Sequence, residues 1–242
     1  AAVLQAARGR WCKLSFYGDP LLRDLTWRTL SACRGPQVSA AAPFPCTVWY
    51  GGATNTYGGV RFTGTLGDYI THVLEARAHE VAPKRTGWVV TPTTNIDGHR
   101  TNASTTAVHA LNLDCDARGT WDRLVAALSS LDICFIAYQS GGWSPSVPKW
   151  HIIMPLARPF DTSTPEKIAA WKSAYTSARV LLGALAELPG EGFDPTVETP
   201  SIPIFVTERR VESDPPRQIV HRLGAALDIE AMATALPAIE EE

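Results

Sequence analysis

Residues 110–116, Ala-Leu-Asn-Leu-Asp-Cys-Asp, form a mostly apolar run that ends in two acids spaced two positions apart. The leucines favour a β-strand, in which successive side chains point to opposite faces. Asp114 and Asp116 are therefore expected on one face, while Cys115 points to the other and packs in the core. Two carboxylates side by side at the end of a buried strand repel each other and are costly to desolvate.

This acid pair has two interpretations. Strand-end acids often simply face water, because aspartates are common in exposed turns. Alternatively, a hard divalent cation with oxygen ligands would bind between the carboxylates and remove the repulsion. The pair alone favours the first interpretation, whereas the segments that follow it favour the second.

Three later segments place polar groups at the ends of apolar runs. The apolar run 133–138 leads into Ser140-Gly141-Gly142, a loop with the backbone freedom to wrap a phosphate. A second strand, 150–156, carries His151 near its start. Further along, Asp194 follows an apolar residue and precedes a proline.

This order of motifs resembles that of the archaeo-eukaryotic primase (AEP) superfamily, in particular the primase–polymerase domains of phages and plasmids. The segment 148–159, PKWHIIMPLARP, is similar to the histidine strand of those domains and to its exit. The resemblance covers the middle half of the chain, from about Trp88 to Val206. It implies a template-dependent DNA primase or polymerase, a nucleotidyltransferase that makes or extends primers on single-stranded DNA.

The resemblance also implies a two-metal site for Mg²⁺ or Mn²⁺, in which the cations activate the attacking hydroxyl and stabilise the leaving pyrophosphate. Backbone N–H groups, a histidine and nearby cations would bind the triphosphate. The expected metal ligands and catalytic residues are Asp114, Asp116 and Asp194, and the expected nucleotide-binding residues are His151, Ser140, Gly141, Gly142, Lys149 and Arg158.

Two features of the pattern leave alternatives open. Residues 143–148 are inserted between the glycine loop and the histidine strand, so the loop groups that reach a nucleotide are uncertain. The third acid has a competitor, because Glu198 lies four residues after Asp194. We expect Asp194 as the ligand and Glu198 as a solvated acid, since the shorter side chain loses less rotamer entropy.

The hydrophobic periodicity predicts an α+β fold. An N-terminal α/β module (about 1–105) would pack on a split β-α-β module like the RNA-recognition fold (about 106–224). The resemblance implies that the two modules together form one primase–polymerase catalytic domain, 1–224. A C-terminal helical tail, 225–242, is expected to follow it. The expected strands are 47–50, 88–91, 108–114, 133–138, 150–156 and 202–207, and the expected helices are 65–78, 121–131 and 165–188. Thr120 is the expected N-cap of the second helix. The third helix is expected to begin at a capping box in 163–166 and to stop at Pro189-Gly190.

Composition narrows the class of protein. The 242 residues include 45% hydrophobic and 19% charged residues, and no run of eighteen apolar residues predicts a membrane span. Five cysteines without a CxxC pair indicate a reducing, cytoplasmic compartment and no zinc ribbon. The net charge of −2 argues against a dedicated duplex-DNA binder. The chain does not begin with Met, so we expect a domain taken from a longer protein.

Two other functions remain open from the sequence. A rolling-circle nicking initiator also uses metal on a small split sheet, but it needs a His-x-His pair, and no two histidines here are two positions apart. A non-catalytic nucleic-acid-binding module could keep the fold without the chemistry. The partners expected for the primase interpretation are a single-stranded DNA template, NTPs or dNTPs, and a replicative helicase domain in the same or a neighbouring chain.

Overall fold

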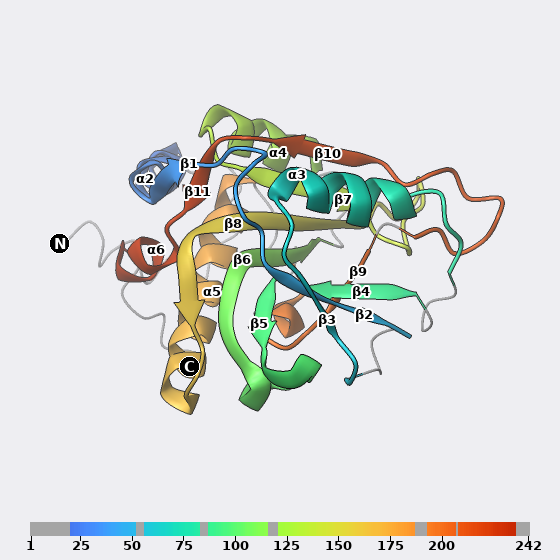
Figure 1. Cartoon of the computed structure of the whole chain (residues 1–242). Coiled ribbons are helices and arrows are strands. Elements are labelled where there is room, and N and C mark those ends of the chain that lie inside the picture. Colours follow the sequence, from blue (N-terminus) through green and yellow to red (C-terminus); the bar gives the residue numbers. More distant parts are fainter. Residues whose placement is uncertain are drawn as a thin grey trace.

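The computed structural model describes residues 20–51, 56–82, 87–115, 121–186, 193–206 and 208–235. These residues form two β-sheets with helices packed around them, which confirms the α+β class (Figure 1). The larger sheet has seven strands and mixes parallel with antiparallel pairs, and the smaller sheet has four antiparallel strands.

The centre of the larger sheet is the predicted split β-α-β unit. Strands β6 (Thr105–Cys115) and β7 (Phe135–Gln139) both pair antiparallel with β8 (Trp150–Asp161), which lies between them. Helix α4 (Trp121–Ser130) connects β6 to β7. The predicted crossover is therefore confirmed, with β6 and β7 parallel to each other across β8; its predicted N-cap, Thr120, lies outside the described residues.

Four more strands extend this sheet. Strand β10 (Ile219–Arg222) pairs with β7, and β5 (Thr93–Asn95) pairs with β6. Strand β11 (Ala225–Leu227) runs parallel to the second half of β8, and β1 (Arg34–Gln37) closes that edge. The long strand β8 thus has different neighbours along its length, β7 beside its first half and β11 beside its second.

The smaller sheet has the order β3 (Val60–Phe62), β2 (Cys46–Tyr50), β4 (Trp88–Thr91) and β9 (Ile204–Phe205). Strands β2 and β4 agree with the sequence prediction. The predicted helical segment 65–78 is also confirmed. It consists of α3 (Leu66–Asp68), a π-helical turn (Tyr69–Leu74) and a 3₁₀ turn (Glu75–Arg77), and its buried residues include Leu66, Ile70 and Leu74.

Helix α5 (Pro165–Leu185) is the long helix of the fold and packs against α2 (Pro20–Ala32), α4 and α6 (Ile229–Ala235). It buries a stripe that includes Trp171 and Tyr175, as expected for a helix with one apolar face. Short 3₁₀ turns complete the described elements: η3 (Ile96–Gly98), η4 (Asn102–Ser104) and η5 (Pro195–Glu198). The predicted stop at Pro189-Gly190 lies outside the described residues.

Two predicted elements are wrong. The strand expected over 202–207 is only the two-residue β9, and it pairs with β4 in the smaller sheet rather than with a strand of the larger sheet. The expected helical tail 225–242 begins with strand β11, which is buried against β8, and the helix starts only at Ile229. Both errors concern short segments whose partners are distant in sequence, so local periodicity does not determine the outcome.

The boundary expected near residue 105 remains a prediction. Strands β1 and β5 lie before it and pair in the larger sheet, whereas β9 lies after it and pairs in the smaller one. The two sheets therefore share chain segments from both sides of that position. Within the described residues, no helix is long and apolar enough to cross a membrane.

The start of α5 differs by one residue from the predicted capping box. Thr164, not Ser163, is the N-cap, and its Oγ1 accepts a hydrogen bond from the Lys167 N–H at 3.4 Å. We expect Thr164→Ala to lower the free energy of unfolding by about 1 kcal/mol, because a helix donor loses its acceptor. Urea denaturation measures the change.

The matched control for this prediction is Ser163→Ala, which should change the free energy of unfolding by less than about 0.5 kcal/mol. An equal or larger loss in the Ser163 variant would show that the cap lies one residue earlier.

Candidate active site

A row of polar side chains crosses the larger sheet at one end. In the strand register, Asp114 on β6 is opposite His151 on β8, and His151 is opposite Tyr138 on β7. Directly paired residues of antiparallel strands share a face, so all three side chains lie on the same side. The Asp114 Oδ1 and His151 Nε2 atoms are 3.5 Å apart.

Strand β9 of the smaller sheet holds His151 in place through a hydrogen bond. The ring is 5% exposed, and its Nδ1 lies 3.1 Å from the main-chain carbonyl oxygen of Phe205 on β9. A carbonyl oxygen only accepts hydrogen bonds, so Nδ1 is protonated, and Nε2 is the nitrogen that faces Asp114. The Tyr138 hydroxyl donates to the same carbonyl at 3.0 Å, and its ring meets the histidine edge-on.

Asp114 is ionised at neutral pH. Burial acts to raise its pKa, but the positive charge and hydrogen bond of His151 and the charge of Lys149 lower it more, so the net pKa lies below its ordinary value. A partly buried carboxylate held in the charged state is the form that ligates a cation or repels an anion.

Asp194 lies immediately beside Asp114. Its backbone N–H donates to the Asp114 carbonyl oxygen at 2.9 Å, and Phe193 forms an antiparallel bridge with Cys115. The Asp194 Oδ1 accepts from the Thr196 N–H at 2.8 Å, which fixes the side-chain direction at the start of η5. A carboxylate has further lone pairs for a second partner.

The competing acid, Glu198, faces a different partner. Its Oε1 lies 3.6 Å from the Lys172 Nζ on helix α5, and both side chains are partly exposed. The structure therefore brings Asp194, rather than Glu198, next to Asp114 through a direct backbone hydrogen bond.

Asp116, the second acid of the predicted pair, lies outside the described residues. Within the residues that the structure does describe, no group of three histidine, cysteine or acidic side chains is placed to hold a metal. The donors that are described nevertheless suit a hard cation: two neighbouring aspartates, and the Asn112 Oδ1, which is buried on the same face of β6 without a hydrogen-bond partner.

The glycine loop meets the histidine strand despite the insertion. The Ser140 N–H donates to the Lys149 carbonyl oxygen at 3.0 Å, two residues before His151. The inserted residues 143–148 form their own turn, closed by hydrogen bonds between Ser144 and Val147. The insertion therefore extends the β7–β8 hairpin by a separate turn, and the glycine loop stays beside the start of the histidine strand.

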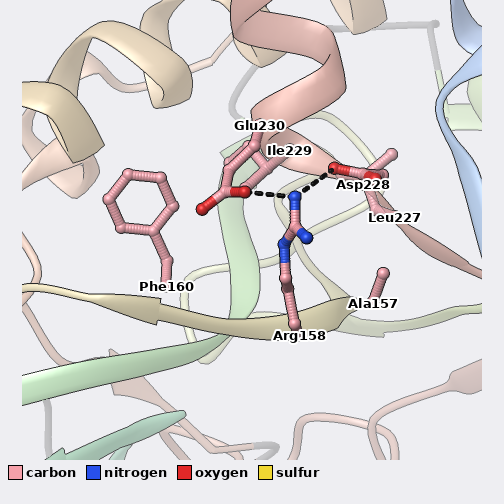
Figure 2. A pocket seen from close by; sticks show the side chains of 7 residues that line it. All are labelled: Ala157, Arg158, Phe160, Leu227, Asp228, Ile229 and Glu230. Carbon is pink, nitrogen blue, oxygen red and sulfur yellow. Dashed lines mark ion pairs between the residues drawn. The ribbon is translucent and has the colours of Figure 1, made fainter.

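Arg158 is the one predicted nucleotide-binding residue that the structure does not bring to this group. It lies seven residues from His151 along β8, a separation of roughly 23 Å in an extended strand. Its guanidinium forms ion pairs with Glu230 and, at 4.0 Å, with Asp228 at the start of α6 (Figure 2). Its described contacts are thus with the C-terminal segment.

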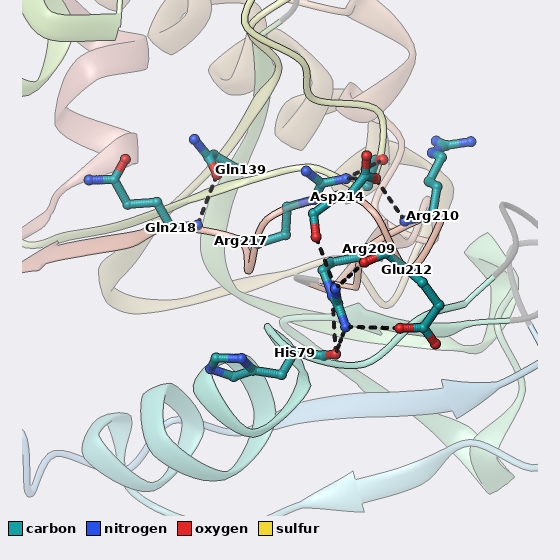
Figure 3. A network of polar contacts seen from close by, with 9 residues as sticks. His79, Gln139, Arg209, Arg210, Glu212, Asp214, Arg217 and Gln218 are labelled. Atoms are coloured by element: carbon teal, nitrogen blue, oxygen red, sulfur yellow. Dashed lines mark hydrogen bonds and ion pairs between the residues drawn. The ribbon is translucent and has the colours of Figure 1, made fainter.

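Two residues beside the glycine loop were missed from the sequence. Arg217 donates from Nη2 to the Gly141 carbonyl oxygen at 3.1 Å, and the Arg210 guanidinium packs against Gly141 and Gly142. Both belong to the segment 208–217, shown in Figure 3, which follows the short strand β9. Three arginines within ten residues were the signal that could have indicated this segment.

The chain was compared with family models, curated proteins and solved structures. No protein-family model matches the sequence, and no curated protein matches it. Among solved structures, the chain is similar to the AEP domain of the Primase-Polymerase (PrimPol) of cyanophage S-2L. The two chains are 20% identical, the match covers 89% of this chain and 98% of that one, and the TM-score is 0.42.

Glu208 is a buried acid at the base of the glycine loop. It is 5% exposed, and its carboxylate accepts the Trp88 backbone N–H at 2.9 and 3.1 Å. Its pKa is raised to about 7, mainly by burial. The hydrogen bond from Trp88 and the charge of Arg77 act to lower the pKa, and the charge of Glu80 acts to raise it.

This raised pKa predicts a pH dependence of stability. The folded state binds the Glu208 proton more tightly than the unfolded state does. The contribution of this protonated side chain to the free energy of unfolding is therefore full below about pH 4.5 and is lost as the pH rises through about 7. We expect the stability of the native chain, relative to Glu208→Gln, to fall between about pH 5 and about pH 8. Urea denaturation at several pH values measures it.

The control for the pH series is Glu212→Gln, because that side chain is 88% exposed. It should leave the pH profile of the native chain unchanged. A profile for Glu208→Gln that parallels the native one would contradict the raised pKa.

Proposed function

We propose that this protein is a template-dependent primase–polymerase that transfers nucleotides by metal-dependent chemistry. The observation that carries the proposal is the convergence at Asp114. Asp194, distant in sequence, is joined to it by a backbone hydrogen bond, and His151 faces its carboxylate at 3.5 Å. An ionised acid, a second acid and an oriented histidine thus meet beside a glycine loop.

The acids would hold the cations. Asp114 and Asp194, with Asp116 from outside the described residues, would bind Mg²⁺ or Mn²⁺ through carboxylate oxygens. When bound, these cations would lower the pKa of the attacking 3′-hydroxyl and neutralise charge on the triphosphate. The pKa of Asp114 already lies below its ordinary value, so this ligand needs no deprotonation to bind a cation.

His151 and the loop would orient the nucleotide. The hydrogen bond from Nδ1 to Phe205 fixes the ring, so Nε2 is held toward the acid row at no further entropic cost. Lys149 lies two residues before His151 and adds positive charge close enough to affect Asp114. Ser140 and the two glycines offer a hydroxyl and backbone donors to phosphate oxygens.

The nicking-initiator alternative is disfavoured by the tyrosines at this site. Such a reaction needs a tyrosine whose hydroxyl can become a nucleophile. Tyr138 is fully buried, donates its hydroxyl to Phe205, and has a pKa raised well above the ordinary value by burial and then by Asp114. Tyr175 is also buried, and burial is the largest cause of its raised pKa.

The resemblance adds partners to this proposal. Single-stranded DNA would be the template and NTPs or dNTPs the substrates, in the replication of a phage or plasmid. A replicative helicase domain, in this chain or a neighbouring one, would supply unwound template. The setting would be cytoplasmic, in keeping with the buried cysteines Cys33, Cys46 and Cys134, which form no disulfide bond.

The direct test is to incubate the protein with single-stranded DNA, labelled nucleotides and Mg²⁺ or Mn²⁺, and to resolve the products by size. We expect incorporation, and a loss of about 100-fold or more in Asp114→Asn, because a charged ligand becomes neutral while its shape is kept. Near-UV circular dichroism confirms that the variant is folded. Products of equal amount from both proteins would contradict the role of Asp114.

The contacts of the two candidates support Asp194 over Glu198 as the proposed third acid. Asp194→Ala should abolish incorporation, because this acid pairs with Asp114, whereas Glu198→Ala should retain most of it, because Glu198 faces Lys172. Both variants are assayed across a Mn²⁺ titration, so that weakened metal binding appears as a shifted midpoint. An inactive Glu198 variant beside an active Asp194 variant would reverse the assignment.

A further inference from the structure

A buried tyrosine on helix α5 has a hydroxyl group without a partner. The Tyr175 side chain is 1% exposed, and its hydroxyl oxygen is buried without a hydrogen bond to any residue that the structure describes. Burying an unpaired hydroxyl group costs free energy, and most buried hydroxyl groups in proteins are paired. An acceptor that becomes available only when the site is loaded would offset this cost.

The face of α5 that carries Tyr175 runs along the segment 193–198, to which the third acid belongs. At one end of this face, the Trp171 Nε1 donates to the carbonyl oxygen of the last residue of that segment at 2.8 Å. At the other end, a Cβ added to Gly183 would lie 3.9 Å from the phenyl ring of its first residue. Positions 171, 175, 179 and 183 are four residues apart and share one side of a helix. Tyr175 therefore lies between the two contacts that join α5 to this segment.

Acidic side chains lie close enough to this hydroxyl to affect it. Burial is the main cause of the raised pKa of Tyr175, and the charge of Arg179 opposes it. Three carboxylates add to the raised pKa, namely Asp114, Asp194 and Glu198. The hydroxyl therefore stays protonated at neutral pH and can donate a hydrogen bond. Coulomb forces attract its oxygen toward the guanidinium and its hydrogen toward the carboxylates.

Asp194 is the carboxylate best suited to accept this hydrogen bond. Asp114 faces a histidine at 3.5 Å, and Glu198 faces a lysine at 3.6 Å. Among the residues that the structure describes, Asp194 has a backbone N–H donor for its Oδ1 but no ion pair with a basic side chain. A carboxylate that binds a cation keeps lone pairs for a second donor, and such a donor fixes the direction of the ligand.

We propose that the Tyr175 hydroxyl is a positioning group for the metal site. When a divalent cation binds, the hydroxyl donates a hydrogen bond to the Asp194 carboxylate and fixes the direction of that ligand. This inference rests on the proposed function, since it concerns a ligand of the cations proposed there. Because the hydroxyl has no partner among the described residues, a hydrogen bond gained together with the cation adds to the affinity for the cation.

The test is titration of the full chain with Mn²⁺ alone, in which electron paramagnetic resonance measures the free ion. Tyr175→Phe keeps the ring and removes only the hydroxyl group. Mn²⁺ binding should weaken by about tenfold, because a metal ligand loses the hydrogen bond that orients it. Native-like affinity for Mn²⁺ in this variant, or no Mn²⁺ binding by the native chain, overturns the proposal.

The matched control is Tyr69→Phe. The Tyr69 hydroxyl is also buried without a partner among the described residues. Its pKa is raised by burial and then by Tyr138 and Cys46, so no acidic side chain contributes. The control variant should bind Mn²⁺ as the native chain does. An equal loss in both variants would show a general effect of removing a buried hydroxyl and would overturn the proposal.

Urea denaturation separates a positioning role from a structural one. Without divalent cation, the unfolding midpoint of Tyr175→Phe should equal or exceed that of the native chain, because no hydrogen bond is lost with the hydroxyl. At a Mn²⁺ concentration above the native Kd, the cation should raise the midpoint less in the variant than in the native chain. A midpoint lowered equally with and without Mn²⁺ would identify a structural hydrogen bond and overturn the proposal.

DNA synthesis distinguishes this inference from the proposed function. In Tyr175→Phe, the Mn²⁺ midpoint for incorporation should change more than the rate at saturating Mn²⁺. Tyrosine-dependent Mn²⁺ binding without any DNA synthesis would keep the positioning role and reject the polymerase. DNA synthesis with the native Mn²⁺ midpoint in Tyr175→Phe would keep the polymerase and reject the positioning role.

Discussion

An ionised carboxylate at a partly buried strand end is the constraint around which the rest of this site is arranged. Burial disfavours the charge on Asp114, and the neighbouring strand compensates with His151 and Lys149. This compensation requires β8 to pair with β6 in one register, because a shift of one residue would send His151 to the opposite face. The acid, its partners and the sheet register are therefore one interdependent arrangement.

The smaller sheet contributes through a single carbonyl group. The Phe205 oxygen accepts from both the Tyr138 hydroxyl and the His151 Nδ1, so one main-chain atom of β9 holds two side chains of the larger sheet. This contact links the two sheets and also fixes the orientation of the His151 ring. A change in how β9 pairs with β4 would consequently alter the histidine that faces Asp114.

Charge is separated along the site. The acids Asp114 and Asp194 lie at one end, and the arginine pair with Lys149 lies around the glycine loop. Lys149 is the residue that connects the two regions. The insertion at 143–148 does not disturb it, because the hairpin still closes with the hydrogen bond between Ser140 and Lys149. The polarity suits a substrate that carries a reacting centre at one end and several anionic oxygens at the other.

The sequence by itself determined the features that depend on local spacing. The alternation of β6 places Asp114 opposite to the buried Cys115, and the capping-box segment 163–166 marks the start of α5 to within one residue. The motif order also predicted Asp194, rather than Glu198, as the third metal ligand, and that assignment stays a prediction. The first two features could be predicted because side-chain alternation and helix capping involve neighbouring residues only.

Only the tertiary structure decided which distant segments come together. Strand β9 joined the smaller sheet, β11 replaced the start of an expected helix, and Arg158 paired with the α6 segment rather than with a nucleotide site. Arg210 and Arg217 reached the glycine loop from a segment with no regular periodicity. The physical reason is that strand pairing and ion pairing between remote residues depend on which sheet edges and charges are left available after the core has packed. Local sequence patterns do not determine that outcome.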